Sequence, residues 1–91
     1  MDDEEAVRLA IDGDPSGPEA LLSRYGMSVY NVGLRMLGNA ADAEDAAQDV
    51  FLRAFSRLHQ YRQGEPFGAW LHGIARHRCL DLLRSRPTIL T

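Results

Sequence analysis

The sequence lacks several features that mark particular protein classes. Its only cysteine is Cys79, so no disulfide can form within the chain and a reduced protein is expected. No long apolar run follows the acidic start Met1–Glu5, so we expect neither a secretion signal nor a membrane span, and a cytoplasmic location. Lysine is absent, and all ten basic side chains are arginine. That bias is compatible with a GC-rich genome and equally with a need for planar, bidentate donors.

Motifs for catalysis and metal binding are missing as well. His72 and His77 are five residues apart, so they do not share a helix face as a zinc pair would, and no second sulfur accompanies Cys79. Asp45 and Asp49 could in principle bind a hard cation, but carboxylates near a helix start more often complement the helix dipole. No phosphate-binding glycine loop or nucleophile elbow occurs. We therefore expect no enzyme activity, no metal and no cofactor.

Charge is sorted along the chain, although the net charge is only −3. Residues 1–50 hold eleven carboxylates and three arginines, a net charge of −8, whereas residues 62–91 hold five arginines and two carboxylates, a net charge of +3. The asymmetry predicts two faces that meet two kinds of partner, one of them a polyanion. The alternative is that both halves are simply solvated helix faces.

Helical periodicity dominates the 91 residues. Apolar residues recur every three or four positions from residue 6 almost to residue 83, and no segment alternates with period two for long. This predicts one all-α domain over residues 1–91, a compact bundle of three main antiparallel helices preceded by a short helix. Glycine, proline and capping residues set the expected boundaries. The helices are expected at about Asp3–Ile11, from Pro18 to Gly38, from Asp42 to the loop Gln60–Glu65, and from Pro66 to about Arg86, before Pro87.

Each long helix has an expected core stripe. The stripes are Leu21, Leu22, Tyr25, Val29, Val32 and Met36 in the second helix, Ala43, Ala47, Val50, Ala54 and Leu58 in the third, and Phe67, Leu71, Ile74, Ala75 and Leu82 in the fourth.

A second stripe on the third helix consists of Asp45, Gln48, Asp49, Leu52, Phe55 and His59. Leu52 and Phe55 lie off the centre of the core stripe, so we expect at least one of them to be partly exposed beside carboxylates, as on a partner-binding face. The alternative is that Phe55 packs at the bundle edge and the acids serve the helix dipole.

A second stripe on the fourth helix consists of Trp70, Gly73, His77, Asp81 and Arg84, with Arg76 beside it. The loop before this helix, Tyr61–Pro66, adds another aromatic ring and Arg62. Rings that stack on bases and arginines that bind phosphates are the combination that holds single-stranded nucleic acid. The alternative is that the only tryptophan is a core residue.

Two segments resemble region 2 of the extracytoplasmic-function group of sigma-70 family transcription initiation factors. The first is NAADAEDAAQDVFLRAF at residues 39–55, which is similar to the family's DAED-xx-Q-[ED]-x-F helix. The second is FGAWLHGIAR at residues 67–76, followed by CLDLLR at residues 79–84, which is similar to the family's F-x-x-W-L-x-x-I-A-R-N-x-x-x-D-x-x-R segment. The resemblance covers about residues 5–86.

The resemblance implies a role for both stripes. It implies docking on the clamp helices of the RNA polymerase β′ subunit through Asp45, Gln48, Asp49, Leu52 and Phe55. It also implies recognition and melting of the minus-ten promoter element by capture of non-template-strand bases, through Tyr61, Arg62, Phe67, Trp70, Arg76, His77 and Arg84. Asp81 either touches DNA or orients Arg84 or Arg78. An anti-sigma factor is a further implied partner.

The chain also departs from the family pattern. His77 stands where the family often has asparagine, Gly68 where a larger polar residue is common, and Glu65–Pro66 adds stiffness and a negative charge to the loop. The promoter base preference therefore stays open. The family's second helical domain, sigma region 4, is not in this chain, which we interpret as an excised domain or a fragment. Competing hypotheses are a helical module that docks on polymerase or an anti-sigma partner without reading DNA, and a double-strand reader of helix-turn-helix type, which the lack of a short recognition helix disfavours.

Overall fold

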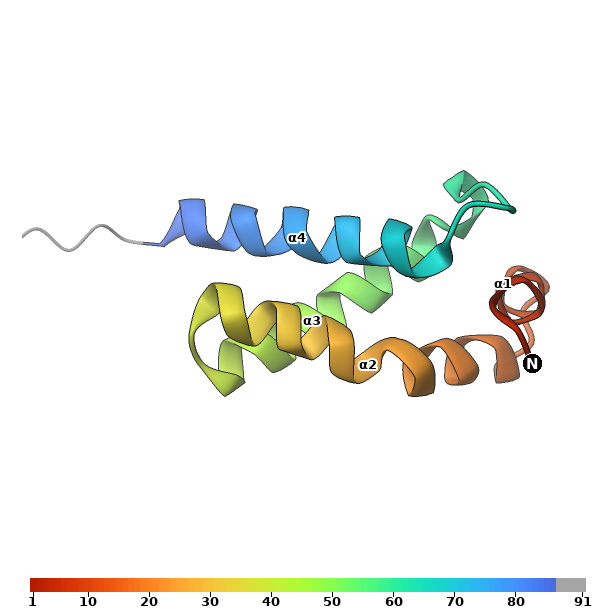
Figure 1. The fold of residues 1–91 in the computed structure, drawn as a ribbon, viewed down its shortest axis with the longest axis horizontal. Helices are drawn as coiled ribbons and strands as arrows, with labels where there is room; N and C mark the ends of the chain where they lie inside the picture. The colour runs from red at the N-terminus through yellow and green to blue at the C-terminus, as the bar shows by residue number, and fades with distance from the viewer. Residues whose placement is uncertain (87–91) are drawn as a thin grey trace, which may run out of the picture.

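The computed structural model describes residues 1–86, and every regular element in this range is a helix. The elements are α1 (Asp3–Ile11), α2 (Ser16–Leu37), α3 (Ala40–Ser56), the short 3-10 helix η1 (Leu58–Gln60) and α4 (Phe67–Ser85). In Figure 1, α2 and α4 run in the same direction, α3 runs back antiparallel to both, and α1 crosses the bundle at the end where α2 begins. The predicted all-α bundle with a short first helix is confirmed. None of the helices in this range is long and apolar enough to span a membrane.

Local capping interactions explain three of the helix ends. The Asp2 carboxylate accepts a hydrogen bond from the Glu5 N–H at 2.8 Å and starts α1, and the Asn39 side chain accepts one from the Asp42 N–H at 2.9 Å and starts α3. Gly38 ends α2 as predicted, because its φ of +84° lies in the left-handed region that glycine adopts without strain. Each of these interactions joins residues three or four positions apart.

The start of α2 differs from the prediction. The helix begins at Ser16, two residues before the expected start at Pro18, and the Asp14 carboxylate accepts hydrogen bonds from the Ser16 N–H at 2.9 Å and from its Oγ at 2.7 Å. Gly17 is a buried helical residue and not a helix breaker. A Cβ at this position would lie 2.5 Å from the Ala10 nitrogen and closer still to the Ala6 carbonyl oxygen. Glycine is therefore what allows the backbone of α1 to cross α2.

The core lies between the three long helices. Its largest fully buried side chains include Leu21, Val50, Phe67 and Leu71. The prediction for Leu22 is wrong: this side chain is 43% exposed, because it points about 100° around the helix from the buried Leu21. The other residues of the predicted stripes are buried or half-buried, and the buried residues outside those stripes include Ala46, Phe51 and Cys79.

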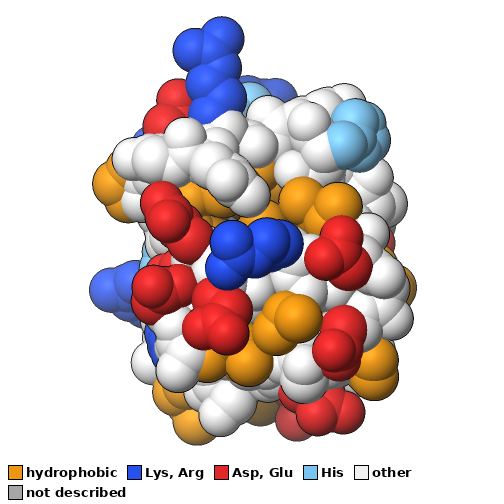
Figure 2. Space-filling model, turned by 90° about the vertical axis from the view of Figure 1, so that its right-hand side faces the viewer, with side chains coloured by type: hydrophobic (Ala, Val, Ile, Leu, Met, Phe, Trp, Pro, Cys, Tyr) orange, Lys and Arg blue, Asp and Glu red, His pale blue; other side chains and the backbone are white. Residues whose placement is uncertain are grey.

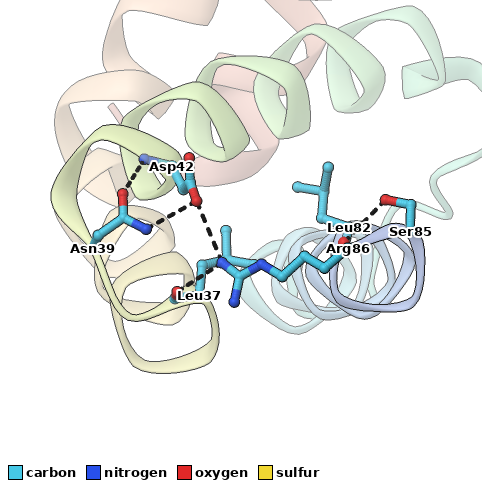
Figure 3. A network of polar contacts seen from close by, with 6 residues as sticks. All are labelled: Leu37, Asn39, Asp42, Leu82, Ser85 and Arg86. Atoms are coloured by element: carbon cyan, nitrogen blue, oxygen red, sulfur yellow. Dashed lines mark hydrogen bonds and ion pairs between the residues drawn. The ribbon is translucent and has the colours of Figure 1, made fainter. Parts of the chain in front are cut away.

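The far end of α4 is tied to the turn between α2 and α3 (Figure 3). One guanidinium nitrogen of Arg86 donates to the Leu37 carbonyl at 2.7 Å and lies 3.3 Å from the Asp42 carboxylate. The same carboxylate accepts a hydrogen bond from the Asn39 amide at 2.8 Å. This network holds α4 against the start of α3. Pro87, the predicted stop signal for α4, lies outside the described residues.

Replacing Gly17 with alanine should destabilise the fold, whereas the same change at Gly26 should not. Gly17→Ala forces a methyl group into the backbone of α1, for which we expect a loss of about 1–3 kcal/mol of unfolding free energy. Gly26 lies in the same helix with open space around its would-be Cβ, so Gly26→Ala should add about 0.5–1 kcal/mol through helix propensity. Urea unfolding followed by circular dichroism measures both. Equal effects of the two changes would contradict the close crossing of α1 and α2.

Candidate functional site

An exposed face of α3 combines one apolar side chain with polar ones. Leu52 is 69% exposed, and Asp45 and Gln48 are exposed beside it on the same side of the helix. A large apolar side chain left in water among polar neighbours is typical of a surface that a partner covers. We call Asp45, Gln48 and Leu52 the α3 face.

The other residues of the predicted stripe, namely Asp49, Phe55 and His59, lie around the edges of the α3 face. Phe55 is half-buried and packs against the core residue Phe51, with ring centroids 5.8 Å apart. It therefore packs at the bundle edge and still keeps part of its ring exposed. His59, which ends the predicted stripe, lies in η1 and is exposed.

Asp49 turns toward α4, at the other edge. Its carboxylate lies 2.8 Å from the Arg53 Nε, one turn along α3, and 2.5 Å from the Arg78 Nε of α4. The Arg78 Nε is buried, and none of its contacts has the geometry of a hydrogen bond. The charge attraction to Asp49 therefore offsets the cost of removing this charged group from water. Asp49 consequently links two helices in addition to bordering the α3 face.

The outward side of α4 carries most of the cationic residues predicted to bind nucleic acid. Arg76, His77 and Arg84 are all exposed, and Gly73 opens the surface between them because it has no side chain. Arg84 lies 3.7 Å from Asp81, whereas Arg78 pairs with Asp49. Of the alternatives for Asp81, the structure thus pairs it with Arg84 and not with Arg78.

Four aromatic side chains form a cluster where the loop meets α4. Phe67 is buried at its centre, with ring centroids 5.6 Å from Tyr25, 5.4 Å from Tyr61 and 5.6 Å from Trp70. Tyr61 is also buried, and its hydroxyl donates to the Glu65 carbonyl across the loop. The rings of Tyr61 and Phe67 therefore support the loop in this structure and present no open face to a base.

Trp70 is the half-buried member of the cluster. One part of its ring packs on Tyr61, with centroids 5.3 Å apart, and the rest is accessible. Trp70 therefore packs on the core and also reaches the surface, and its contact with nucleic acid stays a prediction. Arg62, also predicted to bind DNA, is exposed on the loop.

Carboxylates surround the loop end of the molecule. Figure 2 looks onto the end that carries α1 and shows acidic side chains gathered there. Burial raises the pKa of Tyr61, and the nearby carboxylates of Glu4, Asp3 and Glu65 raise it further. Burial together with a hydrogen bond to Asp3 raises the pKa of Tyr25 to about 12. Both hydroxyls therefore stay protonated at neutral pH, and the carboxylates of α1 and the loop make this end of the fold acidic.

Two grooves run along the flanks of α4. The groove between α3 and α4 has a volume of about 570 Å³ and holds Trp70 and His77 together with three arginines, Arg53, Arg57 and Arg78. The groove on the α2 side has a volume of about 760 Å³ and is lined by Arg76 and Arg35, with Leu34, Met36 and the His72–Ser28 pair, whose Nε2 and Oγ lie 3.0 Å apart. The residues predicted to bind DNA are thus divided between two grooves.

Sequence reasoning missed the arginines that α3 contributes to the first groove. Arg53 and Arg57 are one turn apart, and their i, i+4 spacing was the available signal. Cys79 is buried, which raises the pKa of its thiol. Among residues 1–86, no three His, Cys, Asp or Glu side chains come together in a way that could hold a metal ion.

Comparison with known proteins gives a consistent family match. Residues 21–87 match the family model for Sigma-70 region 2. The chain is 39% identical over 75 residues to the ECF RNA polymerase sigma factor SigE of Mycolicibacterium smegmatis, an alignment that covers 82% of this chain and 28% of that protein. It is 32% identical over 80 residues to ECF RNA polymerase sigma factor SigW of Bacillus subtilis, covering 88% of this chain and 43% of that protein. The chain therefore spans less than half the length of these relatives.

Removal of the Asp49 charge should weaken the contact between α3 and α4. Asp49→Asn leaves the buried Nε of Arg78 without its counter-charge, for which we expect a loss of about 1–3 kcal/mol of unfolding free energy. Asp45→Asn is the matched control, because Asp45 is exposed on the same helix, and its effect should stay within about 0.5 kcal/mol. Urea titration at neutral pH separates the two variants. If they unfold alike, Asp49 does not hold the helices together.

Proposed function

The chain belongs to the sigma-70 region 2 family, in its extracytoplasmic-function group, and we propose that it acts in transcription initiation through two adjacent faces. One face docks on the clamp helices of the RNA polymerase β′ subunit. The other recognises the minus-ten promoter element and melts it by capturing bases of the non-template strand. The observation that carries the proposal is the separation of an apolar, acidic surface on α3 from a cationic surface with an accessible indole on α4.

Polymerase docking is supported by the composition of the α3 face. Leu52 offers an apolar contact, and the charges beside it are acidic, so this surface would not compete for DNA. Asp45, Gln48 and Leu52 are placed to make the contact, with Phe55 and Asp49 at its edges. Because Asp49 already pairs with two arginines, we assign it a supporting part in docking.

Strand capture is supported by the surroundings of Trp70. Flipping a base out of a duplex costs a few kcal/mol, and stacking on an aromatic ring returns roughly 1–3 kcal/mol per base. Trp70 would supply the stacking surface, while Arg62, Arg76, His77 and Arg84 would hold phosphates. Tyr61 and Phe67 would act indirectly, by fixing the loop that meets the strand. Melting is then capture of transiently open bases, without a covalent step, in the cytoplasm where transcription occurs.

A second candidate is a module that docks on polymerase or on an anti-sigma factor without reading DNA. The burial of Tyr61 and Phe67 favours it, since only one aromatic ring of the cluster then reaches the nucleic-acid side. The net charge of −3 also argues against tight duplex binding. An anti-sigma factor would be expected to cover the same two faces.

Truncation of Leu52 should weaken docking on the polymerase. Leu52→Ser removes the apolar side chain from the centre of the α3 face, and we expect about tenfold weaker binding to isolated β′ clamp helices. Met27→Ser is the matched control, because Met27 is 70% exposed but lies on α2. Surface plasmon resonance with immobilised clamp helices measures both affinities. Equal weakening by the two changes, or none by Leu52→Ser, would refute docking through the α3 face.

The single tryptophan provides a direct test of strand capture. A non-template minus-ten oligonucleotide that stacks on Trp70 should quench the intrinsic indole fluorescence. The signal can be assigned to Trp70 because the chain has no other tryptophan. Trp70→Leu keeps apolar packing but removes the stacking surface, and we expect roughly 5- to 150-fold weaker binding by anisotropy of a labelled oligonucleotide. Circular dichroism of the variant controls for folding. Binding by the wild type without quenching would show that Trp70 is only a packing residue.

A further inference from the structure

The groove between α3 and α4 contains cations that the proposed function does not use. Arg53 and Arg57 come from α3, the helix assigned to protein docking, yet both line the same groove as Trp70 and His77. We propose that this groove binds the phosphodiester backbone of the captured strand, with Arg57 as a phosphate contact. The inference rests on the proposed function and adds a second helix to the nucleic-acid surface.

The position of Arg57 makes it suitable for such a contact. It caps the C-terminal end of α3, and its backbone N–H donates to the Ala54 carbonyl at 3.1 Å, which fixes where the side chain originates. The residue is exposed, and within residues 1–86 its side chain makes no ion pair and no hydrogen bond. Its charge is therefore available to an external anion.

The carboxylates near the groove are already neutralised by other arginines. Asp81 is the only acidic residue that lines it and lies 3.7 Å from Arg84. Asp49 of α3 does not line the groove, but it pairs with two arginines that do, Arg53 and Arg78. The groove therefore has an excess of positive charge, although the whole chain is acidic. Such a local excess selects a polyanion over neutral or cationic partners.

The shape of the groove links Arg57 to the proposed stacking residue. Trp70 and Gly73 lie one turn apart on the α4 wall, and a side chain at Gly73 would meet nothing within 4 Å, so the wall is open between Trp70 and His77. A strand with one base on the accessible part of Trp70 can therefore place a neighbouring phosphate in the groove. Arginine suits this task because its planar guanidinium binds phosphate oxygens in a bidentate manner.

The groove on the α2 side is the competing path for the strand. It contains Arg35 and Arg76, but its walls also include Leu34, Met36 and Val32. Apolar walls of this kind suit a protein side chain better than a phosphate. We therefore place the backbone on the α3 side, and Arg35 becomes the matched control for Arg57.

The salt dependence of oligonucleotide binding tests the assignment. Each phosphate contact on a single strand contributes about 0.7 to the slope of log K against log salt concentration. Arg57→Gln should lower the magnitude of that slope by about 0.7, and should weaken minus-ten and scrambled oligonucleotides by the same factor, because a phosphate contact carries no sequence information. Arg35→Gln should leave the slope unchanged. Anisotropy titrations of the labelled strand between about 50 and 200 mM salt measure all three proteins.

The possible failures are distinguishable. If the wild type binds no oligonucleotide at any salt concentration, the proposed function itself fails, and this inference with it. If the wild type binds and quenches Trp70 but Arg57→Gln keeps the wild-type slope, only the phosphate assignment is refuted. A slope lowered by Arg35→Gln in place of Arg57→Gln would put the backbone on the α2 side and would equally overturn the proposal. Circular dichroism checks that both variants remain helical.

Discussion

The burial of Phe67 is the contact on which the rest of the arrangement depends. Its ring lies between Tyr25 of α2, Tyr61 of the loop and Trp70 of its own helix, and it is almost fully buried. Burying an aromatic side chain removes a large apolar area from water, so this one position fixes both the end of the loop and the start of α4. That placement sets the position of the two grooves along α4. It also sets which part of the Trp70 ring is exposed.

The two candidate faces meet at Asp49. Asp49 borders the α3 face and at the same time pairs with two arginines that line the α3–α4 groove. A partner that attracts this carboxylate would change the charge balance of the groove. Asp49 is thus a side chain that belongs to both faces.

The sequence predicts the features that local interactions determine. The helices and the Gly38 stop follow from periodicity and from capping chemistry, which act over three or four residues. The α3 face was predictable for the same reason. Helix α3 begins at Ala40, two residues before the expected start at Asp42, because the Asn39 side chain caps it. The position of Gly17 inside α2 was not predicted, because it depends on a close contact with α1. The core position expected for Leu22 is wrong, because helical periodicity does not show how far the neighbouring helix extends. The burial of Tyr61 and the position of Arg57 are likewise tertiary results that no short pattern contains.

The two ends of α4 are both anchored, and this has a mechanical consequence. Phe67 secures its first turn in the aromatic cluster, and Arg86, just past its last turn, is bound to the Leu37 carbonyl. A helix held at both ends bends very little in its middle, where Gly73 and His77 lie. In the proposed strand capture, any distortion needed for a close fit would therefore come from the nucleic acid. The protein would act as a rigid template, and sequences that unstack easily would bind it with the smallest deformation energy.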